Sequence, residues 1–181
     1  KNAEKLLSMV TQLLDLQKTE LHAECLKVSP YDIKAYLEEK IAEFHMAVLQ
    51  KGVEIQLKAE ADMPQVWMDR DKMDHIVDNL LSNALKYTEK GIIYITVRTT
   101  KKKWSIEVKD TGIGIPRDSI KKIWDRFYKT DLSRGKDKRG TGLGLSIVKE
   151  IIQAHGENID VVSTEGVGSE FIFSLPLATN L

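Results

Sequence analysis

The chain has 181 residues, of which 42% are hydrophobic and 30% are charged, the ordinary balance of a folded globular protein with a real core. Its 27 Lys and Arg residues equal its 27 Asp and Glu residues, so there is no global field to attract nucleic acid or an anionic membrane. Any bound anion must therefore be held by a local site.

Cys25 is the only cysteine, which excludes an internal disulfide and a cysteine-based zinc cluster and fits a reducing compartment. No apolar run approaches the length of a membrane span, and no signal-peptide pattern opens the chain. We therefore expect a cytoplasmic location without membrane contact by this chain. Because the chain starts at Lys1 and not at Met, we also expect it to be a piece of a longer protein.

Residues 2–21 contain no Gly or Pro and predict a helix with a broad apolar surface. Leu6, Met9, Leu13 and Leu16 fall on a seam of heptad type. Such a helix needs partner helices, so we expect one arm of a helical bundle, with a helix internal to the domain as the alternative.

Residues 27–32 predict a short extended segment, since Ser29 precedes Pro30. A helix is expected over residues 33–50, ended by Gly52 and followed by an alternating strand over residues 53–59. The expected buried side of that helix consists of Ile33, Leu37, Ile41, Phe44, Val48 and Leu49.

Residues 71–88 predict a helix, capped by Asp69 or Asp71 and closed by Gly91, that carries two stripes. The apolar stripe consists of Met73, Val77, Leu80, Leu81 and Ala84, and the polar stripe of Asn79, Asn83, Lys86 and Tyr87. A carboxamide oxygen suits Mg²⁺, a lysine pairs with phosphates and a tyrosine packs on a base or ribose. The alternative is that these polar residues merely coat an exposed helix.

Two strands are expected over residues 92–99 and 103–110. Parity places Asp110 on the inward face, where a carboxylate is costly unless a group donates a hydrogen bond to it. Gly112 and Gly114 follow and permit close backbone approach, so we expect a cleft floor where Asp110 accepts a hydrogen bond from an exocyclic amine.

A short helix is expected over residues 119–126, and residues 129–140 have little to bury, which predicts a mobile cationic lid. Gly140, Gly142 and Gly144 then precede a strong amphipathic helix, whose free amides suit phosphate. No strand immediately precedes these glycines, and no Lys-Ser or Lys-Thr follows them as in a Walker loop. We therefore reject a P-loop. A hairpin turning at residues 165–168, with Phe171, Phe173 and Leu175 inward, completes the chain.

Five motifs in this order resemble the signature boxes of sensor histidine kinases: DNLLSNALKYT, DTGIGIP, DRFYKTD, RGTGLGLSIVKEIIQAHG and TEGVGSEF. The resemblance covers residues 30–176 and implies an α+β fold, the two-layer Bergerat ATP-binding sandwich. In that fold a mixed, mainly antiparallel sheet is covered on one face by helices. Residues 1–26 resemble the second helix of the dimerisation and phosphoacceptor domain, which leaves residues 27–181 as the catalytic ATP-binding domain.

The resemblance implies a role for each matching residue. Asn83 would hold Mg²⁺, with Asn79 and Lys86 assisting at the metal and phosphates, and Asp110 would take the adenine amino group. The remaining implied nucleotide contacts are Tyr87, Gly112, Gly114, Ile115, Phe127, Tyr128, Lys129, Arg139, Gly140, Thr141, Gly142, Leu143, Gly144 and Leu145.

The resemblance also implies ATP and Mg²⁺ as cofactors, and a response-regulator receiver domain and the chain's own phosphoacceptor helix bundle, a homodimer, as partners. The parent protein could be anchored in the bacterial inner membrane. The family's phosphoacceptor histidine is absent, because none of His22, His45, His75 and His155 has the required context.

Two rival functions are open at this stage. ATP-hydrolysing relatives carry a glutamate that activates water where this chain has Asn79, and an amide cannot abstract that proton, so we expect slow hydrolysis at best. A module that binds nucleotide, or only a partner protein, without phosphoryl transfer is the second rival.

Overall fold

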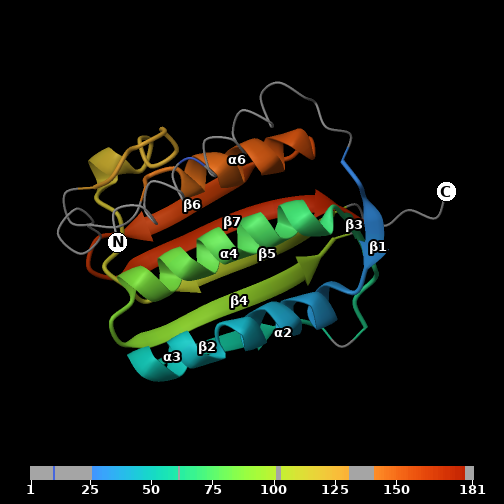
Figure 1. Ribbon diagram of the computed structural model, residues 1–181, viewed down its shortest axis with the longest axis horizontal. Helices are drawn as coiled ribbons and strands as arrows, with labels where there is room; N and C mark the ends of the chain where they lie inside the picture. Colours follow the sequence, from blue (N-terminus) through green and yellow to red (C-terminus); the bar gives the residue numbers. More distant parts are fainter. Residues whose placement is uncertain (1–9, 11–25, 61, 101–102, 131–140, 178–181) are drawn as a thin grey trace.

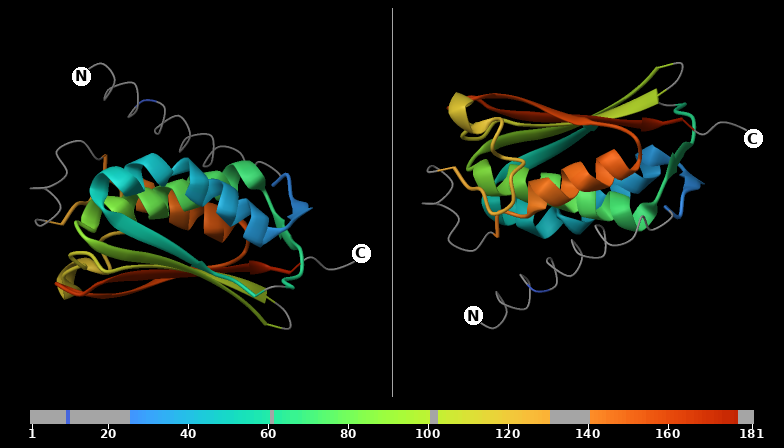
Figure 2. Two further views of the ribbon diagram at one scale, coloured as in Figure 1. Left: turned by 90° about the horizontal axis from the view of Figure 1, so that it is seen from below. Right: turned by 90° about the horizontal axis from the view of Figure 1, so that it is seen from above.

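A computed structural model describes residues 10, 26–60, 62–100, 103–130 and 141–177. Most of them form two layers, a five-stranded sheet and a set of helices on one of its faces, as Figure 1 and Figure 2 show. The two-layer α+β architecture predicted from the sequence is confirmed. The predicted bundle helix over residues 2–21 and most of the predicted lid lie outside the described residues.

The large sheet has the strand order β2-β4-β5-β7-β6. Its strands are β2 (Val53–Lys58), β4 (Gly91–Thr99), β5 (Lys103–Asp110), β6 (Ile159–Thr164) and β7 (Gly168–Pro176). Only β2 and β4 pair in parallel, and the other neighbours are antiparallel. The inward residues of β5 and β7 alternate as predicted, and Trp104, Ile106, Val108, Phe171, Phe173 and Leu175 are all buried.

The described helices are α2 (Ile33–Glu43), α3 (His45–Lys51), α4 (Arg70–Tyr87) and α6 (Gly144–Ala154). The predicted apolar stripe of α4 is buried against the sheet, with Leu80 2% and Leu81 0% exposed, and Asp69 is its N-cap. No helix within the described ranges combines the length and the apolar character that a bilayer span requires.

The single helix predicted over residues 33–50 is wrong, because the chain breaks at Phe44 into α2 and α3. The Phe44 amide donates to the Ile41 carbonyl at 3.1 Å, three residues back, which tightens the last turn and redirects the chain. In consequence α3 buries no residue, and Leu49, predicted to be buried, is 61% exposed.

Two further boundaries differ from the sequence prediction. Helix α4 ends at Tyr87, where Thr88 turns extended (φ −103°), and Gly91 starts β4 and does not close the helix. The predicted helix over residues 119–126 is wrong: the chain forms a short 3₁₀ helix, Arg117–Ser119, and then turns, in which the amides of Ile120, Lys122 and Asp125 bond to carbonyls three residues back. Ile123 is nevertheless buried, as predicted.

A second sheet joins β1 (Ser29–Tyr31) to β3 (Val66–Met68) in antiparallel pairing. The extended segment predicted over residues 27–32 is thereby confirmed, whereas β3 was not predicted. Figure 1 shows both strands beside the N-terminal end of α4. Since β3 runs directly into Asp69 and α4, this small sheet fixes where α4 begins.

Candidate functional site

A cavity of about 280 Å³ lies between α4, the first turn of α6 and the adjoining ends of β5 and β7. Most of the site residues predicted from the sequence line it. They are Asn79, Asn83, Lys86, Tyr87, Asp110, Gly114, Ile115, Tyr128, Lys129, Thr141, Gly142, Gly144 and Leu145. These residues come from four separated stretches of the chain, and folding brings them to one hollow.

The α4 wall of the cavity carries the predicted polar stripe. The Asn79 amide nitrogen donates to the His75 carbonyl at 2.7 Å, and the Asn79 amide oxygen lies against Gly144, where a side chain would collide with it. Asn83 follows one turn later on the same wall. The Lys86 ammonium lies 4.9 Å from the centre of the Tyr87 ring, so a cation and an aromatic ring lie together in the cavity lining.

Asp110, the last residue of β5, lines the cavity and is 7% exposed. Burial raises the pKa of its carboxyl above the ordinary value, and hydrogen bonds from the Gly112 and Ser169 amides offset only part of that rise. The Gly112 amide donates to the Asp110 carboxylate at 2.8 Å. A buried carboxylate facing a cavity can accept a hydrogen bond from a ligand amine.

The glycines after Asp110 shape the floor. Gly112 does not line the cavity, but a Cβ there would stand 2.5 Å from the Tyr87 carbonyl oxygen. Gly114 has φ +68°, and a Cβ there would overlap the Thr164 carbonyl. Only glycine satisfies both demands at position 114, so the chain can pass between α4 and the β6–β7 turn.

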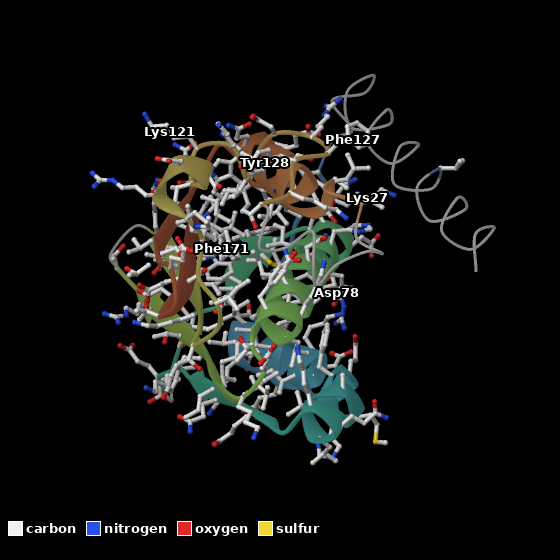
Figure 3. All side chains as sticks on the ribbon, turned by 90° about the vertical axis from the view of Figure 1, so that its left-hand side faces the viewer. Lys27, Asp78, Lys121, Phe127, Tyr128 and Phe171 are labelled. Carbon is white, nitrogen blue, oxygen red and sulfur yellow. The ribbon has the colours of Figure 1, made fainter. Side chains whose placement is uncertain are left out.

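The wall beside α6 depends on contacts between Phe127 and Gly142. The Phe127 amide donates to the Gly142 carbonyl at 2.9 Å. Gly142 has φ +76°, and a side chain at Gly142 would collide with the Phe127 backbone. The Tyr128 hydroxyl donates to Ser119 Oγ at 3.0 Å, which fixes the ring at the cavity. Tyr128 and Phe171, both labelled in Figure 3, line this wall from the turn segment and from β7.

Several predicted residues do not line the cavity. Neither Phe127, which is 59% exposed, nor the fully buried Leu143 is among the lining residues. Arg139 and Gly140 lie outside the described residues. The sequence reasoning missed some lining residues, namely Ala84, Ile113, Ile123, Thr130, Ser169 and Phe171. Strand parity could have found Ser169, because it lies on the same inward face as Phe171 and Phe173. In the structure it pairs with Asp110.

The donor set fits magnesium nucleotide. In the part of the chain that the structure describes, no three His, Cys, Asp or Glu side chains are grouped to hold a metal ion. Asn83, which lines the cavity, has a neutral amide oxygen, and such an oxygen suits Mg²⁺ when the other ligands are phosphate oxygens and water. The N-cap residue of α6, Leu143, makes no side-chain capping bond, and the N-terminal end of a helix favours an anion.

Comparison with known proteins decides the family. Residues 68–179 match the family described as histidine kinase-, DNA gyrase B- and HSP90-like ATPases. The chain belongs to this ATPase family. Within it, the chain is a catalytic ATP-binding domain of the histidine kinase type, as the following relatives indicate.

The chain is 37% identical over 176 residues to "Sensor histidine kinase WalK" of Bacillus subtilis (strain 168). The aligned region covers 96% of this chain and 29% of that protein. It is 46% identical over 114 residues to "Sensor protein SrrB" of Staphylococcus aureus (strain NCTC 8325 / PS 47), 62% of this chain and 20% of that protein. The chain therefore spans less than a third of these relatives.

Solved structures agree with this assignment to the ATPase family. Full-length ShkA in complex with AMPPNP superposes with a TM-score of 0.87 at 31% identity, covering 97% of this chain and 36% of that one. The catalytic domain of histidine kinase ThkA superposes with a TM-score of 0.74 at 28% identity, covering 85% of this chain and 100% of that one.

Proposed function

We propose that this domain binds ATP with Mg²⁺ and transfers the γ-phosphoryl group to a histidine on a helix bundle, for relay to an aspartate on a response-regulator receiver domain. One observation carries the proposal: Asn83, Asp110 and the glycine-bounded start of α6 meet at a single cavity although they are far apart in sequence. That set provides a metal ligand, an acceptor for a base and amides for phosphates.

Each part of the nucleotide has a matching partner in this proposal. Asp110 accepts a hydrogen bond from the adenine amino group, and Asn83 holds the metal ion. Lys86, Lys129 and the first-turn amides of α6 receive the phosphates. Bound Mg²⁺ would neutralise charge on the phosphate oxygens.

The chain's own residues position the substrate and supply no strong base. A neutral imidazole is already a competent nucleophile, so an acceptor histidine needs no activation by this domain. Asn79 cannot abstract a proton from water, and its amide nitrogen is occupied by the His75 carbonyl. The site therefore favours transfer to histidine over ATP hydrolysis.

We also propose the domain boundaries, the oligomeric state and the location of the full protein. Residues 1–26 form the second helix of a dimerisation and phosphoacceptor domain, and residues 27–181 form the catalytic domain. The full protein acts as a homodimer at the cytoplasmic side of the bacterial inner membrane or free in the cytoplasm. Because the 181-residue chain has a net charge of zero, the proposal includes no contact of this chain with nucleic acid or membrane.

Calorimetry on Asn83→Ala tests the metal and nucleotide roles. We expect ATP affinity in the presence of Mg²⁺ to fall by about tenfold or more, the scale of a lost contact to a charged group. The matched control Asn158→Ala removes an exposed amide outside the cavity and should leave affinity unchanged. Equal affinity of both variants would remove Asn83 from the site.

Phosphoryl transfer itself is tested with radiolabelled ATP, Mg²⁺ and a separately produced first bundle helix that contains the acceptor histidine. We expect acid-labile label on the histidine and slow release of free phosphate. Nucleotide binding without label on the histidine would favour the rival function, a regulatory module that binds nucleotide only.

A further inference from the structure

The Asp69 side chain, remote from the cavity, joins two parts of the chain through its two carboxylate oxygens. One oxygen accepts the Lys72 amide at 3.2 Å, within the first turn of α4. The other accepts the Lys27 amide at 2.8 Å, from a residue 42 positions earlier. Asp69 is 6% exposed, and both bonds are partly buried, although Lys27 itself is an exposed residue.

Helix capping explains only one of these bonds. A serine or threonine would cap α4 as well, and Asp71 already supplies a negative charge in the first turn. The second carboxylate oxygen accepts the amide of Lys27, which comes just before β1. A buried carboxylate that accepts two amides from distant stretches fixes their relative position.

Strand β3 brings more of the chain to the same point. Its partner β1 lies in register Ser29 to Met68 and Tyr31 to Val66, and Leu177 bridges to Val66 from the other end of the described chain. Val66 and Met68 are both fully buried, so β3 is held in the core. Strand β1 and Leu177, from the two ends of the described domain, thus both contact β3. Strand β3 runs directly into Asp69 and α4.

Helix α4 carries Asn79 and Asn83 on its cavity wall, and its backbone is continuous from Arg70 to Tyr87. A change in the direction of the chain at Lys27 would therefore displace the first turn of α4, the helix that carries the proposed nucleotide ligands. Met73 N also donates to the Asp69 carbonyl at 2.9 Å, so the backbone of Asp69 belongs to the same rigid turn.

We propose that Asp69 is a positioning residue that fixes the direction in which the segment before residue 27 leaves the catalytic domain, and so sets the nucleotide relative to the phosphoacceptor. This inference rests on the proposed function. It assigns to Asp69 no contact with nucleotide or metal, because Asp69 does not line the cavity.

The bond is tested first in the 181-residue chain by amide hydrogen exchange. Asp69→Ser keeps one oxygen for the Lys72 amide and has none for Lys27. We expect the Lys27 amide to exchange at least about tenfold faster in this variant, while the Met73 amide remains slow. An unchanged Lys27 amide would overturn the proposal.

The functional consequence is tested in the full-length kinase with a matched pair at one position. Lys27→Pro removes the amide donor and leaves Asp69 intact, whereas Lys27→Ala keeps the donor. At saturating ATP we expect Lys27→Pro and Asp69→Ser to slow histidine phosphorylation by roughly tenfold, since small misplacements of reacting groups cost this much or more. The KM for ATP should stay within about twofold of the unmodified kinase, and Lys27→Ala should behave like that kinase.

Two results would overturn the positioning role: equal rates for Lys27→Pro and Lys27→Ala, or a rise in the KM for ATP as large as the fall in rate. The second result would show that the site itself is damaged. Absence of phosphohistidine in the unmodified kinase would instead refute the proposed function, and with it this inference.

Discussion

The Asp110 carboxylate and the Gly112 amide form a 2.8 Å hydrogen bond at the floor of the cavity, which holds one carboxylate oxygen and leaves the side chain facing the hollow. The same glycine lies against the Tyr87 carbonyl. The end of β5 and the end of α4 are therefore fixed to each other through a residue without a side chain. This contact fixes the geometry of the cavity at Asp110.

Replacing Asp110 by Asn should weaken ATP binding, because the amide group of Asn presents a donor where the carboxylate accepts. We expect a loss of about 1–3 kcal/mol, roughly fivefold to 150-fold in affinity. Calorimetry with an ATP analogue measures it. Asp160→Asn, on the exposed side of β6, is the control and should bind normally. Affinity retained in Asp110→Asn would exclude Asp110 from base recognition.

The raised pKa of Asp110 predicts an acid-sensitive site. In the proposed function the ionised carboxylate accepts a hydrogen bond from the adenine amine, so ATP affinity should fall as the pH drops through the pKa of Asp110, which lies above its ordinary value of 3.8. Titrating affinity between neutral and mildly acidic pH in the unmodified chain and in Asp110→Asn checks this. A pH dependence that is identical in the two proteins would contradict the assignment.

The raised pKa of Asp110 affects the stability of the fold in the opposite direction to ATP affinity: stability falls as the pH rises. An acid whose pKa is raised by folding binds more protons in the folded state, so it lowers the free energy of unfolding as the pH rises from 3.8 through the folded pKa. In Asp110→Asn this contribution disappears. Chemical denaturation across that window, with Asp160→Asn as the reference, measures the difference.

Gly114 and Gly156 form a matched pair for backbone strain. Both have positive φ, +68° and +74°, but only Gly114 faces another group, the Thr164 carbonyl, whereas the position beside Gly156 is open. Gly156→Ala should cost about 1–2 kcal/mol for the left-handed backbone alone. Gly114→Ala should cost clearly more and also weaken ATP binding. Equal free energies of unfolding for the two variants would contradict the crowding at Gly114.

Lys40 belongs to α2, is 4% exposed, and joins α2 to α4 through its ion pair with Asp78. Burial alone would lower its pKa, but Asp78 at 2.8 Å and Glu43 at 2.7 Å outweigh burial and hold the pKa above 10.5. Figure 3 labels Asp78 on the outer side of α4, away from the sheet. Because Lys40 bridges two helices, Lys40→Met should destabilise the domain by about 1–3 kcal/mol, a range discounted for the partly exposed carboxylates.

The same cluster predicts alkaline sensitivity. The Tyr36 hydroxyl donates to Asp74 at 2.8 Å, and burial, followed by that carboxylate, raises its pKa far above 10.0. Raised pKa values at Lys40 and Tyr36 both stabilise the fold below about pH 10, and this contribution is lost as the pH rises further. Denaturation above pH 10 should show a smaller decline in the double variant Tyr36→Phe, Lys40→Met than in the unmodified chain.

The parts of the fold that the sequence predicted are those with an unbroken period. Helix α4 and strands β5 and β7 have regular apolar stripes, and they were predicted to within a few residues. The break at Phe44 was missed because the apolar spacing continues across it, and only a hydrogen bond to Ile41 reveals the change of direction. Strand β3 was missed because three residues cannot show an alternation.

The site was predicted where a side chain or a glycine has a local reason for its identity. Asn83, Asp110 and Gly114 were found in this way. Ile113 and Thr130 reach the cavity through turns whose path no spacing encodes. The second bond of Asp69 also left no trace in the sequence, because its donor is a backbone amide that any residue other than proline could supply.

The cavity draws its walls from α4, β5, β7 and α6, so no contiguous part of the chain can form it before the whole sheet has assembled. A nucleotide will therefore recognise folded molecules alone, and at 100 times its dissociation constant it adds about 2.7 kcal/mol to the free energy of unfolding. Resistance to heat and to proteases should consequently follow the supply of ATP, which makes the lifetime of this domain depend on its own substrate.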